Sequence, residues 1–319
     1  MGEINRVELP HLELPANELM EMARMRHREG NYNLAADLYQ QVIEQGNSKS
    51  MPYAMYNLAN MLRQGQIGRL ENGQPDYEQA AFLYQRVIEQ GDHETMPSAM
   101  YNLAFMFRQG RIGRLENGQP DYKQAVDLYQ QVIKQRNPEA MSLAMVDLAY
   151  MLHQGQTGLI NSQPDYAQAA DLYRQVIEQR DPETMPHAMN NLALMLCQGQ
   201  TGLINSQPDY AQAADLYRQV IEQGDPETMF GAMNNLANML RRGQIGRLEN
   251  GQPDYAQAAD LYQQAIIRGN EIGNTTVVNI AQQNLNRLNQ QIRQQTAQNF
   301  AGAISWFSQN QSISRGGRG

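Results

Sequence analysis

Aromatic side chains recur at related positions in the first half of the chain, and arginines stand close to them. The aromatic residues are Tyr53, Tyr56, Tyr101, Phe105 and Tyr150, and the arginines are Arg63 and Arg108. Aromatic rings and guanidinium groups are enriched at the energetic hot spots of protein interfaces. We therefore hypothesise that these rings form the floor of a site for a peptide or a helix. The alternative is that the rings pack against a neighbouring helix of the protein itself.

A second set of polar residues recurs beside the aromatic set. It consists of Asn57, Asn102, Asp147, Asn191 and Asn235. Side-chain amides suit contacts with peptide groups, because each offers two donors and an acceptor. The alternative is that these amides bond an adjacent helix or loop and fix the stacking, and the sequence leaves both roles open. Asp147 replaces the amide with a carboxylate and adds a negative charge in the middle of the set.

The residue patterns of catalytic and metal sites are missing. The sequence contains no His-Glu-x-x-His pattern, no Cys-x-x-Cys pattern and no glycine-rich phosphate loop after a strand. His153 and Cys197 occupy corresponding positions, but two ligands without a third make a zinc site improbable. We therefore expect no catalytic residue, no metal and no cofactor.

An internal repeat positions all of these residues. Its leading tyrosine recurs at steps of 45, 45, 44, 44 and 45 residues, at Tyr32, Tyr77, Tyr122, Tyr166, Tyr210 and Tyr255. Such a period is typical of stacked-repeat proteins, in which each unit buries its apolar face only against its neighbours. The sequence predicts an all-α fold, a right-handed α/α solenoid of stacked helix pairs.

Each regular unit contains a front helix, a loop and a back helix. In the first full unit, apolar residues at helical spacing predict a front helix over 51–64 and a back helix over 77–90. Asp76 precedes the back helix and is expected to cap it by accepting from a free backbone amide. Equivalent aspartates recur in the other units, at Asp121, Asp165, Asp209 and Asp254.

The ends of the back helices and the loops give further expectations. Gly91 suits the left-handed turn that ends a helix, whereas Arg136 and Arg180 at the same place predict strained or differently closed turns. In the loop that joins the two helices of a unit, we expect Leu70 to pack beneath the loop. Arg69 is either solvated or part of a basic rim.

The chain divides into five parts. We predict an extended lead-in over 1–15, a helix pair over 16–50, five full repeats over 51–270, a capping helix with an apolar tag over 271–307, and a disordered Arg/Gly-rich tail over 308–319. The capping helix is expected to end near Gln298. The apolar tag at 300–307 either covers the last helix pair or mediates oligomerisation.

Bulk composition limits the partners and the compartment. The net charge of −8 argues against nucleic acid, because nucleic-acid affinity depends on Lys and Arg neutralising phosphates. No apolar run approaches the roughly 20 residues needed to span a bilayer, so we expect no membrane insertion. The single cysteine favours a reducing compartment. We expect a cytoplasmic protein, or one delivered to another cell's cytosol if it is a secreted effector.

The repeated residues resemble the Sel-one-like repeat, a longer-looped relative of the tetratricopeptide repeat. The resemblance rests on Ala54, Asn57, Leu58, Ala59, Met61, Gly65 and Gly68, followed by Asp76, Ala80, Leu83, Tyr84 and Gly91. It covers about 51–270, while the first helix pair looks more like an ordinary tetratricopeptide unit. Leu83 stands where the family often has Trp, and Ala59 where Gly is usual.

The resemblance implies an α/α solenoid that works as a protein-interaction scaffold, often in bacteria, with no enzymatic activity. In peptide-binding tetratricopeptide domains, the residue that matches Asn57 holds the ligand backbone. Our leading hypothesis is a non-catalytic scaffold that binds a protein or peptide in the concave groove of the front helices. The alternatives are a regulator or inhibitor that wraps one enzyme or effector, and a self-assembling structural protein that uses the apolar tag.

Overall fold

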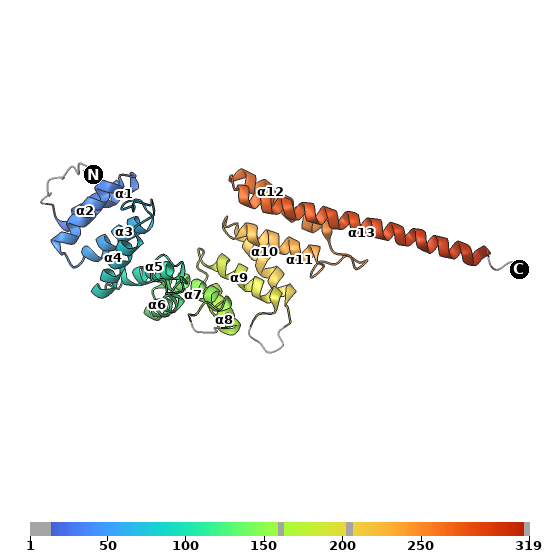
Figure 1. Ribbon diagram of the computed structural model, residues 1–319, viewed down its shortest axis with the longest axis horizontal. Coiled ribbons are helices and arrows are strands. Elements are labelled where there is room, and N and C mark those ends of the chain that lie inside the picture. Colours follow the sequence, from blue (N-terminus) through green and yellow to red (C-terminus); the bar gives the residue numbers. More distant parts are fainter. Residues whose placement is uncertain (1–13, 159–162, 202–206, 316–319) are drawn as a thin grey trace. The chain divides into compact units, whose positions relative to one another are not determined.

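The computed structural model describes residues 14–158, 163–201 and 207–315, with side chains up to residue 303. Within these residues the chain forms thirteen α-helices and no β-strand (Figure 1). The helices are α1 (Ala16–Arg28), α2 (Tyr32–Gln45), α3 (Met51–Arg63), α4 (Tyr77–Gln90), α5 (Met96–Arg108), α6 (Tyr122–Gln135), α7 (Pro138–His153), α8 (Tyr166–Gln179), α9 (Met185–Gln198), α10 (Tyr210–Gln223), α11 (Met229–Arg241), α12 (Tyr255–Glu271) and α13 (Thr275–Arg315).

The chain divides into two units, Met1–Asp165 and Tyr166–Gly319. In the first unit, the front helices α1, α3, α5 and α7 alternate along the chain with the back helices α2, α4 and α6. In the second unit, the back helices α8, α10 and α12 alternate with the front helices α9 and α11, and α13 follows. Consecutive helices within each unit pack on one another. The predicted all-α solenoid of stacked helix pairs is confirmed.

Local hydrogen bonds explain where the back helices begin. The Asp76 carboxylate accepts from the Gln79 backbone amide at 3.0 Å. This bond satisfies one of the amides that lack a partner in the first turn of a helix. Equivalent bonds start the later back helices at Asp121, Asp209 and Asp254. The aspartate that recurs in the sequence therefore sets the start of the back helix in these repeats.

The back helices end in left-handed turns. Gly91 closes α4 with a φ of 67°. Arg136 and Arg180 adopt the same conformation, with φ values of 57° and 56°. A residue with a Cβ pays a steric cost in this region that glycine does not. The two strained turns expected from the sequence are therefore present.

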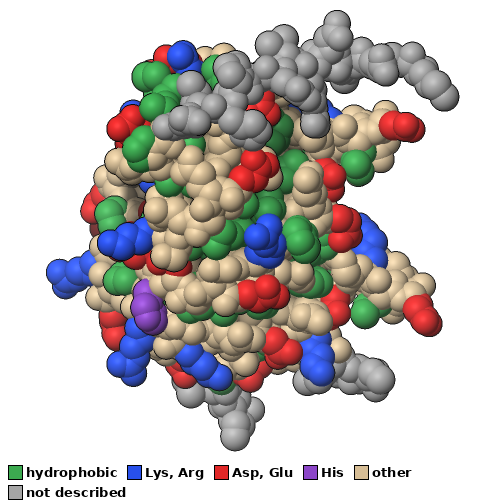
Figure 2. All heavy atoms as spheres, turned by 90° about the vertical axis from the view of Figure 1, so that its left-hand side faces the viewer, with side chains coloured by type: hydrophobic (Ala, Val, Ile, Leu, Met, Phe, Trp, Pro, Cys, Tyr) green, Lys and Arg blue, Asp and Glu red, His purple; other side chains and the backbone are tan. Residues whose placement is uncertain are grey.

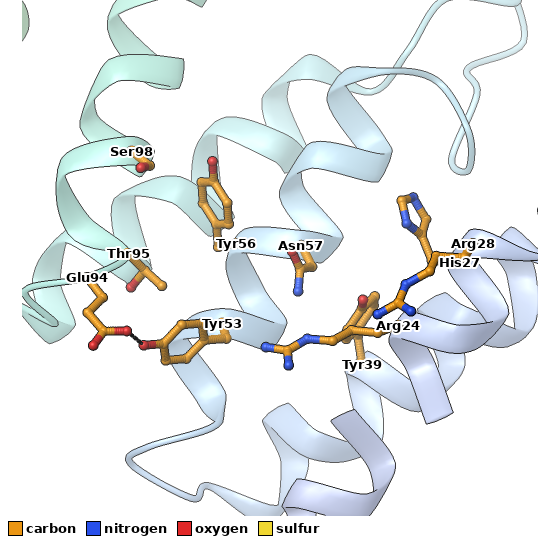
Figure 3. Close-up of a pocket in the computed structure, with 10 residues that line it drawn as sticks. All are labelled: Arg24, His27, Arg28, Tyr39, Tyr53, Tyr56, Asn57, Glu94, Thr95 and Ser98. Carbon is orange, nitrogen blue, oxygen red and sulfur yellow. Dashed lines mark hydrogen bonds between the residues drawn. The ribbon is translucent and has the colours of Figure 1, made fainter. Parts of the chain in front are cut away.

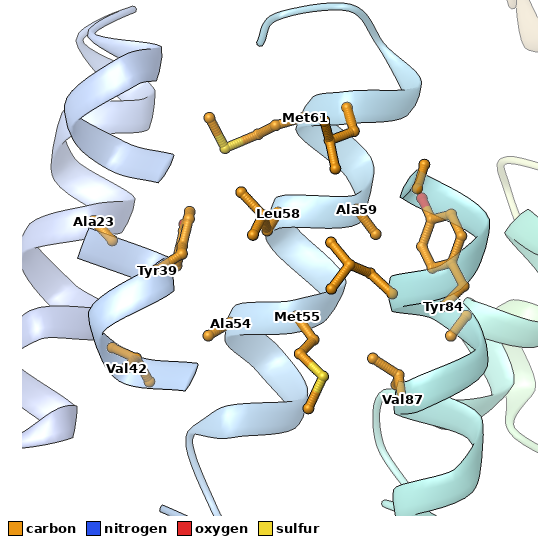
Figure 4. Packing of buried hydrophobic residues seen from close by; sticks show 14 of the residues in the cluster. Ala23, Tyr39, Val42, Ala54, Met55, Leu58, Ala59, Met61, Tyr84 and Val87 are labelled. Atoms are coloured by element: carbon orange, nitrogen blue, oxygen red, sulfur yellow. The ribbon is translucent and has the colours of Figure 1, made fainter. Parts of the chain in front are cut away.

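The core is built by front helices that lie between back helices. Figure 4 shows α3 with Ala54, Met55 and Leu58 directed into the packed interior. Tyr39 from α2 and Tyr84 from α4 are buried in the same cluster, which continues along the unit from Ala16 to Ile112. The methionines of the front helices fill this interior, as their flexible unbranched side chains allow.

The loop between α3 and α4 is closed by an arginine. Arg69 donates from Nη1 to the Gly73 carbonyl at 2.8 Å, and its guanidinium lies against Gly65. Arg69 is exposed, and its side chain also holds the loop together, a role that neither expectation included. The expectation that Leu70 packs beneath the loop is wrong, since Leu70 is 49% exposed.

The last helix is longer than the sequence suggested. Buried Ala281 and Leu288 anchor the first part of α13, which packs on α12 and α11. The predicted end near Gln298 and the predicted disorder of residues 308–315 are wrong, because α13 continues to Arg315. The segment contains no proline, and its alanines and glutamines favour helix. Residues 1–13 of the predicted lead-in and residues 316–319 lie outside the described residues.

The strained turn at Arg136 gives a stability prediction. Replacement of Arg136 by Gly is expected to raise the free energy of unfolding by up to about 1 kcal/mol, because the left-handed turn no longer carries a Cβ. Urea denaturation followed by circular dichroism measures this. The matched control, Gly91→Ala, introduces a Cβ at the equivalent turn and should lower stability by a similar amount. A destabilised Arg136→Gly variant would contradict the assignment of strain.

Candidate functional site

One end of the front-helix face carries an open pocket. Helical spacing places Tyr53, Tyr56 and Asn57 on the same side of α3, and all three are half-buried. They line a cavity of about 380 Å³ together with residues of α1 and of the first turn of α5 (Figure 3). The structure therefore brings together three of the predicted binding residues. We call this cavity the α1–α3 pocket.

Helix α1 supplies basic side chains to this pocket that the sequence analysis missed. Arg24, His27 and Arg28 lie one turn apart and line the pocket opposite Tyr53. Figure 3 shows Arg24 extending from α1 toward Tyr53. Tyr39 of α2 also lines the pocket. Burial raises the pKa of the Tyr39 hydroxyl, and the charges of Arg24 and Arg28 act in the opposite direction.

The other rim of the pocket is fixed by a tyrosine–glutamate hydrogen bond. The Tyr53 hydroxyl donates to the carboxylate of Glu94, which precedes α5 (Figure 3). This bond, with a smaller contribution from burial, raises the pKa of Tyr53 to about 12, because the protonated hydroxyl is the donor. Tyr53 therefore joins α3 to the turn before α5, and the Glu94 carboxylate is already engaged.

The buried tyrosines of the back helices reach the front-helix face through their hydroxyls. The Tyr84 hydroxyl donates to Asn60 at 2.6 Å. Arg63 donates from Nε to the same hydroxyl at 3.3 Å. Asn102, which is 8% exposed, donates to Asn60 at 3.1 Å and to the Tyr56 hydroxyl at 3.3 Å. The side chain of Asn102 therefore links consecutive front helices and is little accessible to a ligand.

Between α5 and α7 the predicted residues form a packed cluster around Arg108. The Arg108 guanidinium lies 3.4 Å from the Asp147 carboxylate and over the rings of Phe105 and Tyr150, at 5.0 and 5.7 Å. The Tyr101 hydroxyl donates to Asp147 at 3.1 Å. Only Tyr150 is substantially exposed, at 40%. We call these five residues the Arg108 cluster.

The five predicted aromatic residues therefore fall into two groups. Tyr53 and Tyr56 line the α1–α3 pocket, whereas Tyr101, Phe105 and Tyr150 belong to the Arg108 cluster. The rings of the second group are engaged with protein groups.

The remaining predicted residues lie in the second unit. Asn191 and Asn235 are half-buried on α9 and α11. Burial raises the pKa of the Tyr217 hydroxyl, and the neighbouring Asn235 side chain acts in the opposite direction. Burial also raises the pKa of the Cys197 thiol, to about 11, which keeps the thiol protonated at neutral pH.

No three His, Cys, Asp or Glu residues among those described are placed to hold a metal ion. None of the described helices combines the length and apolar character that a membrane crossing requires.

Stacked helix pairs with long inner loops define this protein as an α-solenoid of the tetratricopeptide type. The chain belongs to the Sel1 repeat family. The Sel1 repeat model matches residues 26–47, 52–92, 97–137, 142–181, 186–225 and 231–270. The first match is shorter than the others and covers α2 with only the last residues of α1. Repeats of this family generally mediate protein–protein interactions and act as non-catalytic scaffolds.

Solved structures support the fold. The chain is 22% identical, with a TM-score of 0.58, to a protective antigen of uropathogenic Escherichia coli strains that displays an SLR fold; the match covers 86% of this chain and 51% of that one. The chain thus spans about half the length of that relative. A Sel1 repeat protein from Oxalobacter formigenes is 18% identical with a TM-score of 0.52, covering 81% of this chain and 89% of that one. No curated protein sequence matches the chain.

The Arg108 cluster gives a testable prediction. Asp147→Asn leaves the Arg108 side chain, which is 19% exposed, without its carboxylate. The free energy of unfolding is expected to fall by about 1–3 kcal/mol, because a largely buried cation loses its partner. Urea denaturation measures the change.

The matched control is Asp171→Asn. It breaks the Arg174–Asp171 pair at 2.8 Å, whose side chains are 45% and 66% exposed. Exposed pairs contribute roughly 0–1 kcal/mol, so this variant should unfold near the wild-type midpoint. Equal effects of the two substitutions would contradict a structural role for Asp147.

Proposed function

We propose that this protein is a non-catalytic interaction scaffold that binds a peptide segment of a protein partner on the front-helix face of its first unit. One observation carries the proposal. The α1–α3 pocket is open, and tyrosine, arginine and asparagine side chains line it. Tyr and Arg are the types that dominate interface energetics, and an amide can bond peptide groups in either sense.

Recognition in this proposal combines a preformed frame with side chains that differ between repeats. The back helices and the buried methionines hold the front helices in place. The hydrogen bond from Tyr53 to Glu94 fixes one wall of the pocket before a partner arrives. A preformed site lowers the ordering cost of binding. The Arg108 cluster then acts as a stiff continuation of the face.

A protein or peptide fits the surface chemistry better than a nucleic acid does. The chain carries a net charge of −8. On the face shown in Figure 2, acidic and basic side chains are interspersed with hydrophobic ones. A protein that neutralises a phosphate backbone presents a basic stripe or patch instead.

A reducing cytosol as the site of action is also part of the proposal, and this part rests on the single cysteine.

Substitutions in the pocket test the proposal. Tyr53→Ala combined with Asn57→Ala removes a ring and an amide from the pocket, so the partner should be lost from affinity capture followed by mass spectrometry. Truncation of a central interface residue often costs 2 kcal/mol or more, which is about a 30-fold weaker complex. The circular dichroism spectrum should stay unchanged.

Phe82→Ala is the matched control. It removes an aromatic ring that is 56% exposed on the back helix α4. Partners that depend on the front-helix face should bind this variant like the wild type. Partners that survive the double substitution but are lost with Phe82→Ala would place the interface on the back helices and refute the proposal.

A second candidate function is self-assembly through the end of α13. Phe300 is 69% exposed on this helix. The side chains of residues 304–307, the last four of the predicted apolar tag, lie outside the described ones. An exposed ring on a projecting helix is a candidate for contact with another copy of the chain.

Light scattering tests this second candidate. Comparison of the full chain with a 1–298 truncation should show a higher molar mass for the full chain, rising with concentration, if the tag mediates assembly. The truncation retains the anchoring residues Ala281 and Leu288, so it should stay folded. A monomeric mass for both proteins at high concentration would rule out this candidate.

A further inference from the structure

We infer that the α1–α3 pocket is an anion site that anchors a carboxylate of the bound peptide between Arg24 and Arg28. The inference rests on the proposed function and names the chemistry of the partner. It identifies α1, which the repeat pattern did not single out, as the element that selects the ligand.

The charges that line the pocket do not balance. Arg24 and Arg28 face a single acidic side chain, Glu94, which already accepts the Tyr53 hydrogen bond. The charges of Arg24, Arg28 and Glu94 together leave one unit of excess positive charge. This excess occurs in a chain whose net charge is −8. A bound carboxylate neutralises it.

Both guanidinium groups are available to a ligand. The partner of Arg24 is Glu21, at 2.9 Å, but the two side chains are 39% and 70% exposed. Exposed pairs of this kind contribute roughly 0–1 kcal/mol, so an incoming carboxylate can replace Glu21 at small cost. Arg28 is exposed and makes no hydrogen bond or ion pair with the described residues.

The neutral lining of the pocket also suits a peptide carboxylate. Tyr39 remains protonated because burial raises the pKa of its hydroxyl, so it can donate to an anion. Asn57 offers an amide donor from α3. The rings of Tyr53 and Tyr56 provide apolar surface for the residue beside the carboxylate. Guanidinium groups bind carboxylates through paired hydrogen bonds, which gives orientation as well as affinity.

The size of the pocket sets the size of the ligand group. Its volume of about 380 Å³ lies near the lower end of the roughly 300–1,000 Å³ typical of ligand pockets. Such a pocket takes one or two side chains of an extended segment. The carboxylate can come from an Asp or Glu side chain or from the chain end of the partner. Both sources present the same group to Arg24 and Arg28.

Two pooled octapeptide libraries test the inference, one with free C-terminal carboxylates and one with C-terminal amides. Each is passed over the immobilised full chain, and the retained peptides are sequenced by mass spectrometry. The wild type should enrich Asp and Glu from both libraries if a side chain is bound. It should retain peptides from the free-acid library alone if the carboxylate at the chain end is bound.

Charge removal separates a site from general attraction. Arg24→Gln with Arg28→Gln should weaken binding of the selected acidic peptides on the order of tenfold or more, because two charged hydrogen-bond donors are lost. The control variant, Arg174→Gln with Arg218→Gln, removes the same charge from exposed ion pairs on back helices, where the two arginine side chains are 45% and 51% exposed. This control should bind the peptides like the wild type. Arg28→Gln alone covers the case in which the double variant does not fold.

Three results would overturn the inference. The first is equal retention of peptides from both libraries without enrichment of Asp or Glu, and the second is equal binding of the selected peptides by the Arg24/Arg28 variant and the wild type. If neutral peptides are retained and then lost with Tyr53→Ala, the anion site fails while the scaffold function stands. The third is a wild-type protein that retains no peptide from either library, and this result removes both proposals.

Discussion

The structure depends on hydrogen bonds that join buried tyrosine hydroxyls of the back helices to side chains of the front helices. Each back helix places a tyrosine ring in the core. The rings of Tyr84, Tyr129 and Tyr262, for example, are fully buried. A buried hydroxyl without a hydrogen bond would cost stability, so it is almost always satisfied. Tyr84 donates to Asn60, Tyr129 to Asp147 and Tyr262 to Asn238. The acceptors stand on front helices, so the same bonds fasten the frame to the face that we propose for binding.

This constraint limits which face residues are free to vary. Asn60 serves the Tyr84 hydroxyl and also accepts from Asn102, so one amide supports two helices. The first repeat differs, because Tyr39 has the charges of Arg24 and Arg28 nearby and its hydroxyl lines the α1–α3 pocket. The start of the solenoid therefore places donors in the lining of a pocket, where the later repeats use them internally.

Much of the frame could be predicted because its signals are local. Asp76 and Gly91 mark the start and end of a back helix through bonds within a few residues. The role of Arg69 could not be predicted, since the Gly73 carbonyl that it reaches is positioned only by the closed loop. The α1 cations were missed because the short first turn shifts the register. When Ala23 is aligned with Ala59, Arg24 falls at the repeat position of Asn60. This correspondence is the sequence signal that could have identified the α1 cations.

Two neighbouring stretches of one face thus reach different states through the size of the side chains they carry. At the place of Asn60, α5 and α7 have Phe105 and Tyr150, and these rings enclose Arg108. A ligand at that cluster would have to replace cation–π contacts worth about 0.5–1 kcal/mol each, as well as the ion pair with Asp147. A ligand at the α1–α3 pocket replaces solvent and one exposed pair. The energetic difference favours the pocket as the point of first attachment, with the Arg108 cluster as a rigid surface beyond it.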